Sequence, residues 1–300
     1  MVNRPRSALR LGMSPLLLWA IPFFVVTLVA EALWARRART LRPYELKDTA
    51  TSLSLGIVHL GVAALAGGAV LVLWGWVHDH RLFDLRADAW WSWVLLLFLE
   101  DLTYYVWHRT SHEVRFFWAS HVNHHSSTAY NLSTALRQSV TDPLTGHVFW
   151  LPLVLLGFHP LMVVTQQAVS LLYQYLLHTE AVGRLPGVIE AVFNTPSHHR
   201  VHHGSNAAYL DRNHAGIFII WDRLFGTFVP EREPVVYGLT KDLGTFNFLT
   251  VAFHEWAAIG RDVKRAKSVR EVLGAVFGPP GWQADGRGET SAVLRARVPR

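Results

Sequence analysis

The chain has 300 residues, of which 51% are hydrophobic, and it contains 13 tryptophans and no cysteine. This composition, with a positive mean hydropathy of +0.20, argues against a soluble globular protein, and the absence of cysteine excludes iron–sulfur clusters and thiolate-ligated haem. The net charge of +6 suits a surface over anionic lipid, and no interleaving of basic and aromatic residues indicates a nucleic-acid partner.

Apolar runs at 14–35 and 53–77 are each long enough to cross about 30 Å of hydrocarbon. A third run, 89–107, begins with tryptophans and becomes amphipathic at its end, so this span is expected to tilt or to leave the bilayer there. The stretch 144–177 is interrupted by Gly157, His159 and Pro160 and predicts a hairpin of two helices. Together the runs predict an all-α integral membrane protein with about four transmembrane helices.

Charges around the first run predict the orientation of the chain. Arg4, Arg6 and Arg10 precede the run, but more positive charge follows it, including Arg36 and Arg37 and also Arg39 and Arg42. The length of the run favours a retained anchor over a cleaved signal, and the positive-inside rule places the 36–52 loop in the cytoplasm. A multi-pass count from that loop puts every histidine motif described below at the cytoplasmic face.

Three regions follow from these patterns: anchor helices at 1–94, a histidine-rich domain at 95–230 that includes the hairpin 144–177, and a C-terminal segment at 231–300. Asp142 and Pro143 predict the start of the hairpin, and Ser197 predicts the cap of a short helix that ends at Gly204. The amphipathic stretch 246–267 is expected either to lie on the membrane surface or to pack on the core. From Pro279 the composition predicts a loosely ordered tail.

Histidine is concentrated between positions 108 and 203. Residues three and four apart share one face of a helix, so H-V-N-H-H at 121–125 and H-R-V-H-H at 199–203 each predict three rings that converge on one point. Imidazole is a ligand of Fe, Zn, Cu and Ni, and one ion needs only about four to six donors, so the pattern predicts two neighbouring metal ions in a helical cap. The candidate ligands are His108, His112, His121, His124, His125, His178, His198, His199, His202 and His203. His214 is the most plausible addition among the remaining histidines.

The residue types around these motifs narrow the chemistry. The sequence has no H-E-x-x-H, since Val114, Arg115 and Phe116 follow His112 and Glu113, and no G-x-S-x-G or Walker motif. Two-metal hydrolases usually rely on bridging carboxylates, and few acids lie beside the motifs. Histidine-bound iron that activates O₂ therefore fits better than a metal-dependent hydrolase. A histidine-rich metal transporter fits least, because the motifs lie outside the apolar runs.

Three stretches in this order resemble the fatty acid hydroxylase, or sterol desaturase, superfamily: D-L-T-Y-Y-V-W-H-R-T-S-H (101–112), H-V-N-H-H-S-S (121–127) and N-T-P-S-H-H-R-V-H-H-G (194–204), the last followed by D-R-N-H-A-G-I-F-I-I-W-D-R-L-F-G-T-F (211–228). Within the superfamily, Y-N-L-S-T-A-L-R-Q-S (130–139) is most similar to the alkylglycerol monooxygenase branch. The resemblance implies a membrane di-iron enzyme that uses O₂ to hydroxylate or desaturate a lipid such as a fatty acyl, sterol or ether lipid, with the ten histidines as ligands.

Further expectations follow from the resemblance and the residues together. Glu113 matches an acidic position associated with activity in the ether-lipid branch, whereas Asn213, His214 and Ala215 stand where the family usually has Asn-Tyr-Gly. Electrons must come from a separate donor, and the resemblance allows tetrahydrobiopterin. Asp101 is expected either to orient a histidine ring as a hydrogen-bond acceptor or to be a charge at the end of a helix. Tyr104 and Tyr105 are expected to belong to the aromatic belt of the membrane interface. Arg137 and Gln138 are expected either to contact a lipid head group or reductant or to be ordinary solvated residues.

Overall fold

The computed structural model describes residues 15–38 and 44–298, and within them the protein is helical, with two isolated β-bridges and no strand. Arg4, Arg6, Arg10, Arg39 and Arg42, on which the predicted orientation partly rests, lie outside the described residues. The α-helices are α1 Pro15–Arg37, α2 Leu46–Asp79, α3 Trp90–Glu113, α4 Arg115–Ala119, α5 Val122–His125, α6 Leu132–Ala135, α7 Asp142–Thr145, α8 Leu151–Leu156, α9 Pro160–Tyr175, α10 Gly187–Val192, α11 Pro196–His202, α12 Ile220–Leu224, α13 Phe248–Arg265, α14 Val269–Phe277 and α15 Ser291–Ala296, and a 3₁₀ helix, η2, covers Gly146–Trp150.

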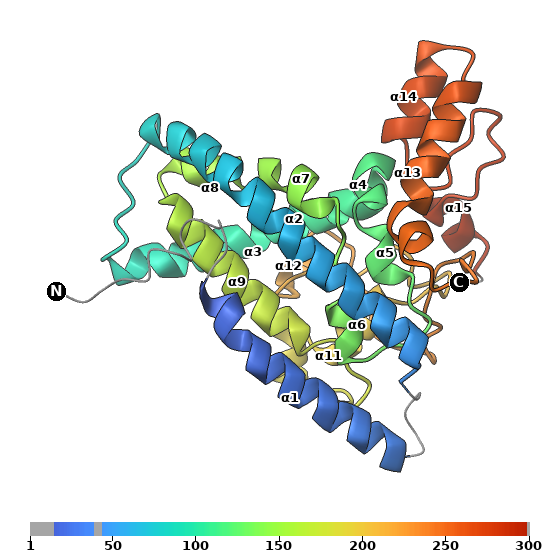
Figure 1. Cartoon of the computed structure of the whole chain (residues 1–300), viewed down its shortest axis with the longest axis horizontal. Helices are drawn as coiled ribbons and strands as arrows, with labels where there is room; N and C mark the ends of the chain where they lie inside the picture. The colour runs from blue at the N-terminus through green and yellow to red at the C-terminus, as the bar shows by residue number, and fades with distance from the viewer. Residues whose placement is uncertain (1–14, 39–43, 299–300) are drawn as a thin grey trace.

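Two helices in the described part of the chain are long and apolar enough to cross a membrane, Trp19–Arg37 within α1 and Leu46–Asp79, which is α2. Of the 18-residue stretch that is most apolar in each helix, only 6% and 11% of the residues are buried inside the protein, so both helices present apolar side chains outward. Figure 1 shows them running side by side with α9. The third apolar run forms α3, which buries Glu100 and Asp101 and does not qualify as a span.

The predicted hairpin has its break at the expected place. Gly157 adopts a φ of 122°, and His159 and Pro160 then begin α9. A side chain at Gly157 would collide with the carbonyl of Phe83, so this bend needs glycine. The limb before the break is itself divided into α7, η2 and α8, and α9 has 16 residues, short of the roughly 20 that cross a bilayer. The helix starts at Asp142 with Thr141 as its N-cap, one residue earlier than expected.

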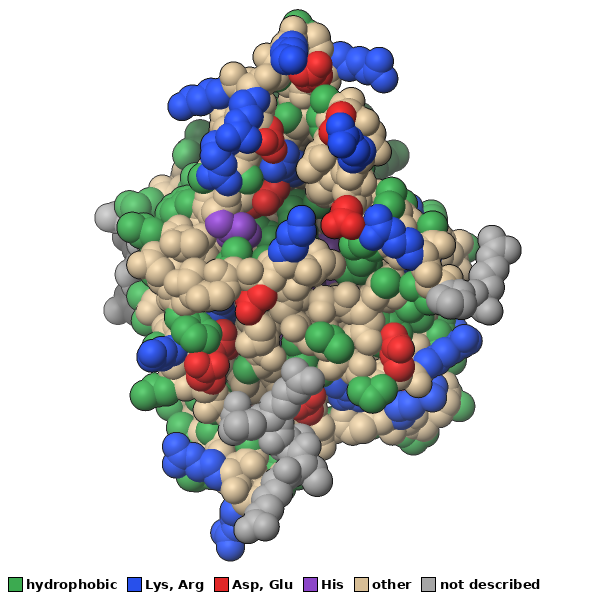
Figure 2. Space-filling model, turned by 90° about the vertical axis from the view of Figure 1, so that its right-hand side faces the viewer, with side chains coloured by type: hydrophobic (Ala, Val, Ile, Leu, Met, Phe, Trp, Pro, Cys, Tyr) green, Lys and Arg blue, Asp and Glu red, His purple; other side chains and the backbone are tan. Residues whose placement is uncertain are grey.

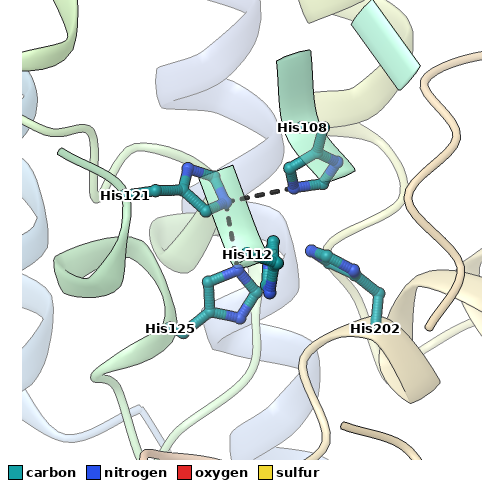
Figure 3. A group of neighbouring side chains, drawn as sticks. All are labelled: His108, His112, His121, His125 and His202. Atoms are coloured by element: carbon teal, nitrogen blue, oxygen red, sulfur yellow. Dashed lines mark hydrogen bonds between the residues drawn. The ribbon is translucent and has the colours of Figure 1, made fainter. Parts of the chain in front are cut away.

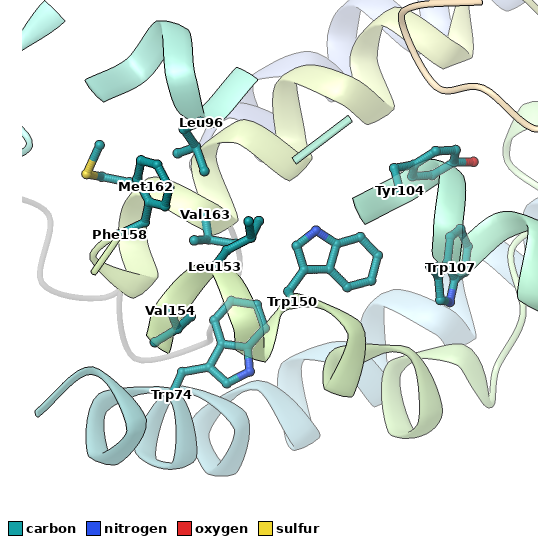
Figure 4. Close-up of a cluster of buried hydrophobic side chains, with 10 residues drawn as sticks. All are labelled: Trp74, Leu96, Tyr104, Trp107, Trp150, Leu153, Val154, Phe158, Met162 and Val163. Atoms are coloured by element: carbon teal, nitrogen blue, oxygen red, sulfur yellow. The ribbon is translucent and has the colours of Figure 1, made fainter. Parts of the chain in front are cut away.

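A buried apolar cluster joins these elements (Figure 4). It includes Trp74 of α2, Leu96 and Trp107 of α3, Trp150 of η2 and Val163 of α9, all at most 9% exposed. Aromatic side chains contribute most of its area, and the burial of each is worth roughly 2–3 kcal/mol. The cluster lies along α3 on the N-terminal side of His108 and His112, and it therefore fixes the helix that carries these two histidines.

The C-terminal region is more structured than its composition predicts. Trp282 packs against Gly274 of α14, and α15 forms beyond it. Arg295 of α15 donates to the carbonyl of Leu210 at 2.8 Å and lies 3.3 Å from the Asp211 carboxylate. The expectation of a loosely ordered tail from Pro279 is therefore wrong for residues 279–298, because aromatic and arginine contacts tie this segment to the rest of the protein.

Candidate metal centre

Nine of the ten predicted histidines meet in the interior as two groups. The first group has five rings and the second has four, and within each group one nitrogen per ring lies within 4.8 Å of all the others. Group one comprises His108, His112, His121, His125 and His202, and group two comprises His124, His178, His199 and His203. Figure 3 shows the rings of group one approaching one centre from α3, from α5 and the residue before it, and from α11. All nine residues are at most 8% exposed.

Each histidine triplet is divided between the two groups. His121 and His125 belong to group one and His124 to group two, while His202 belongs to group one and His199 and His203 to group two. The expectation that each triplet converges on one point is therefore wrong. Neighbours in sequence on a helix point about 100° apart, and His121 precedes α5 with φ −132°, so the rings diverge toward two centres. The two groups remain adjacent, since the ring centroids of His125 and His203 are 4.4 Å apart.

His198 lies outside both groups. Its Nε2 faces the Glu190 carboxylate at 3.5 Å, and its ring meets the edge of Phe228 at a centroid distance of 5.3 Å. Burial lowers the pKa of His198 to about 4, so the ring is neutral at pH 7. Ser197 donates to Glu190 and Thr195 is the N-cap of α11, which corrects the predicted cap. The His198 ring therefore packs against Glu190 of α10, whereas the ring of the next residue, His199, points into group two.

Backbone carbonyls determine which ring nitrogens can bind a metal. Nδ1 of His108 lies 2.8 Å from the carbonyl of His214, and Nδ1 of His178 lies 2.8 Å from that of Gln174. A carbonyl only accepts, so each Nδ1 carries the hydrogen and each Nε2 exposes a lone pair. His124 and His202 make the same contact, with the carbonyls of Arg137 at 3.3 Å and Arg212 at 3.0 Å. This is the tautomer that metal-bound histidines adopt.

Several of these lone pairs face one another at short distance. Nε2 of His124 lies 3.2 Å from Nε2 of His178, although both nitrogens lack a hydrogen in the neutral rings. Two lone pairs at this distance repel unless a cation lies between them. Nε2 of His112, His202 and His203 is buried without a hydrogen-bond partner. Unpaired buried nitrogens are costly without such a cation, so the donor set fits two metal ions, one in each group.

The electrostatics of the groups keep the rings neutral. Burial, followed by the proximity of other histidines, lowers the pKa of eight of the nine rings. For His178 the pKa falls to about 3. Neutral imidazole is the form that coordinates a metal, so the site is prepared for metal at pH 7 without loss of protons from most ligands.

A loop at 211–216 orients group one, and its role was not among the expectations drawn from the sequence. The carbonyls of Arg212 and His214 accept from His202 and His108, and the Asp211 carboxylate lies 3.6 Å from Nδ1 of His112. Asp211 and Asn213 adopt φ of 50° and 54°, a left-handed conformation that turns successive carbonyls toward different rings. The D-R-N-H run carries a sequence signal for this, because Asp and Asn tolerate that conformation best among residues with side chains.

Buried polar side chains support this loop. Asp222 accepts the backbone N–H of His214 and Ala215, both at 2.8 Å, and Asn213 accepts the N–H of Val229 at 2.8 Å. Asp101 accepts the N–H of Ile217 at 2.6 Å and of Phe218 at 2.9 Å, and also the indole N–H of Trp221 at 2.9 Å. Asp101 therefore does not orient His108 or His112 directly, as one expectation had it, but holds the loop that does.

His214 lies beside group one. Its ring is fully buried, and its centroid is 5.1 Å from that of His112 and 5.8 Å from that of His108. Neither ring nitrogen has a hydrogen-bond partner within standard geometry. Burial lowers its pKa well below the ordinary value. Its backbone nitrogen is fixed by Asp222 and its carbonyl accepts from His108, so the residue contributes to the site through its main chain as well as its position.

The other predicted residues have clear locations. Glu113 is half-exposed and pairs with Arg109 at 2.8 Å, so its carboxylate lies on the surface of α3. Arg137 is 1% exposed and pairs with Asp48 of α2 at 3.1 Å, which makes it a link between helices and excludes a solvated role. Tyr104 and Tyr105 are buried in the protein, and the hydroxyl of Tyr105 bonds to Thr227 at 2.9 Å, so neither forms an aromatic belt.

Comparison with known proteins adds an independent result. Residues 93–227 match the family model described as fatty acid hydroxylase. Alkylglycerol monooxygenase of Homo sapiens is 38% identical over 284 residues, which are 93% of this chain and 62% of that protein, and the Danio rerio protein of the same name is 40% identical over 270 residues, 88% and 59%. Ornithine lipid hydroxylase of Rhizobium tropici is 30% identical over 183 residues, 60% and 55%. The chain thus spans less than two thirds of each of these relatives, and no solved structure matches it.

Proposed function

Residues 93–227 make this chain a member of the fatty acid hydroxylase family, and from that premise we propose that it is a membrane-bound di-iron monooxygenase that hydroxylates a lipid. The observation that carries the proposal is the convergence of nine buried histidines in two adjacent groups. Two iron ions, when bound there, would supply the redox chemistry by which O₂ oxidises a C–H bond. Desaturation by the same chemistry is the nearest variant.

The ligand types favour this reaction over the alternatives. Every donor in the two groups is an imidazole, whereas two-metal hydrolases usually join their ions through carboxylates. Asp211 is the acid beside group one, and its 3.6 Å contact is with a ring nitrogen of His112. Backbone carbonyls of this chain hold four of the rings in one tautomer, and burial keeps eight of the nine rings neutral and shields them from water. A metal-dependent hydrolase or a metal transporter has no comparable support.

The substrate class follows from the setting and the relatives. The outward apolar faces of α1 and α2 suit a protein that takes its substrate from a bilayer. Two relatives that are 38% and 40% identical over 93% and 88% of the chain are named alkylglycerol monooxygenases. An ether-linked glycerolipid is therefore the substrate that we propose first. A fatty acyl chain, a sterol and an amino-acid lipid are the alternatives to compare with it.

Several finer features belong to the same proposal. The chain would be multi-pass, with about four membrane-associated helical segments and both histidine groups on the cytoplasmic side. Electrons would come from a separate donor, for which a tetrahydrobiopterin-type reductant is the first to test. Glu113 would act from the surface of α3, where its half-exposed carboxylate, paired with Arg109, is accessible to the substrate or the donor.

The test combines metal analysis with product analysis. Protein purified in detergent is expected to contain close to two iron ions per chain, with a Mössbauer spectrum of nitrogen-ligated iron. With a reductant and isotopically labelled O₂, mass spectrometry of a lipid extract is expected to find one labelled oxygen in a product lipid. Activity supported by zinc alone, without O₂ consumption, would refute the oxygenase assignment.

A further inference from the structure

Helices α13 and α14 form a hairpin that projects from the side of the protein (Figure 1). On α14, Val269, Leu273 and Phe277 follow one another at intervals of four residues and form a single stripe. Their exposed fractions are 75%, 53% and 55%, although other faces of the same helix are covered by Trp282 and by contacts of Ala275. Three large apolar residues in a row remain uncovered, which is unusual for a surface in contact with water.

Basic side chains surround this stripe. The segment 261–270, which contains the turn between the two helices, has five exposed Lys and Arg residues: Arg261, Lys264, Arg265, Lys267 and Arg270. Figure 2 shows Lys and Arg side chains gathered at the tip of the hairpin, at the top of that view. Two acids accompany them: Asp262, which pairs with Arg115 at 2.7 Å, and Glu271, which accepts the backbone N–H of Lys267 at 2.8 Å. The five cations outnumber these acids, so the tip carries net positive charge.

The base of the hairpin is attached to the segment between the first two histidine motifs. Arg115 of α4 donates to Glu255 at 2.6 Å and to Asp262 at 2.7 Å, both on α13, and to the carbonyl of Ala275 on α14 at 3.2 Å. Its backbone N–H also donates to the carbonyl of Gly278. Arg115 is only 7% exposed, so these buried contacts attach the hairpin firmly to α4.

We infer that the α13–α14 hairpin docks on an anionic lipid surface, with the stripe of α14 in the interfacial region and the basic tip against the head groups. An exposed apolar stripe beside a cluster of Lys and Arg is the pattern of helices that lie in such an interface. An acidic protein would be matched by the charges but would leave the stripe without a partner. The inference concerns how the protein sits on its membrane and does not depend on the proposed reaction.

The natural absence of cysteine allows a direct test, because one introduced cysteine carries the only label. Leu273→Cys places a nitroxide in the stripe, and Ala284→Cys places it at an exposed site after α14. The labelled full chain is studied in detergent and in nanodiscs of phosphatidylcholine with and without phosphatidylserine. In the anionic nanodiscs, the label at 273 is expected to become accessible to O₂ and protected from a water-soluble relaxant, whereas the label at 284 stays in water.

A charge variant supplies the second arm. Lys264→Gln with Lys267→Gln is expected to weaken the protection at 273 in anionic nanodiscs, whereas the matched control Arg232→Gln with Lys241→Gln, which also removes two exposed cations, leaves it unchanged. A label at 273 that stays in water in every nanodisc would overturn the inference and favour a protein partner. Equal protection in nanodiscs with and without phosphatidylserine would also overturn it, because anionic lipid would then not be what holds the stripe. Iron content, measured in parallel, reports on the proposed metal site separately.

Discussion

Two adjacent residues of α11 offer a sharp test of the metal centre. His199 belongs to group two, where its Nε2 lies 3.0 Å from Nε2 of His178. His198 precedes it, is equally buried, and faces Glu190 instead. His199→Ala is therefore expected to release the ion of group two, while His198→Gln is expected to leave both ions in place. The pair separates loss of a ligand from general damage to the helix.

The size of the effect follows from the number of donors. Structural zinc sites with four protein ligands bind their ion with about 10–16 kcal/mol, so on that scale each donor contributes roughly 2.5–4 kcal/mol, or about two to three orders of magnitude in affinity. Group two has four histidines, and the loss of His199 leaves three. Group one has five, so His125→Ala leaves four and is expected to weaken its ion less.

Mass-spectrometric metal analysis after dialysis against a weak chelator measures this directly, with a thermal melt to show that each variant is folded. The expected stoichiometry is near one iron ion per chain for His199→Ala and near two for His198→Gln. Equal loss of metal in both variants, with unchanged melting temperatures, would show that His198 is also a ligand and that the assignment of ligands to the two groups is wrong. Full metal content in His199→Ala would refute group two altogether.

Three further predictions concern the surroundings of the ions. In the metal-free protein, His178 has a pKa of about 3 in the folded state and 6.5 in the unfolded chain. Between these two values only the unfolded state gains a proton at this residue, so the free energy of unfolding falls as pH falls, by up to about 1.4 kcal/mol per pH unit. The loss of stability between about pH 7.5 and about pH 5.5, measured by thermal melts, should therefore be smaller in His178→Gln than in the unsubstituted protein. Asp222→Ala leaves two buried N–H donors without their acceptor and should destabilise the protein by about 3 kcal/mol or more in denaturant unfolding, whereas an unchanged midpoint would show that the loop 211–216 does not need it. Glu113→Gln should lower lipid oxidation while iron content stays unchanged, and a loss of iron instead would assign Glu113 to the metal centre.

The sequence could predict the metal-binding character of the centre because the histidines are close together in sequence. Spacings within 108–112, 121–125 and 199–203 are local, and helix geometry converts them into neighbouring rings without knowledge of the fold. The bend at Gly157 was predictable for the same reason. His178 is a candidate ligand that stands alone in the sequence, and the structure brings it beside His124 and His199.

The loop that orients the rings was beyond such local reasoning. Asp101 lies 116 positions before Ile217, whose N–H it accepts, and no local pattern indicates that pairing. The same applies to Arg137, whose guanidinium reaches Asp48 of α2 across 89 positions. Both looked like exposed or functional charges in sequence, and both are buried because a long-range partner satisfies them. The exact turn at 211–216 likewise depends on contacts made by Asp222 and Asn194.

The division of the triplets has a consequence for how the two ions are held. His124 and His125 are adjacent in sequence and belong to different groups, with ring centroids 5.4 Å apart, and His202 and His203 repeat this arrangement at 5.3 Å. With one ion in each group, the spacing of the ions would be set by the peptide backbone of α5 and α11 and would not require a bridging carboxylate. A shift of either helix would move ligands of both ions at once. Substitutions in the two groups should therefore be non-additive in their effect on iron content, and a double-mutant cycle between His125 and His203 measures that coupling.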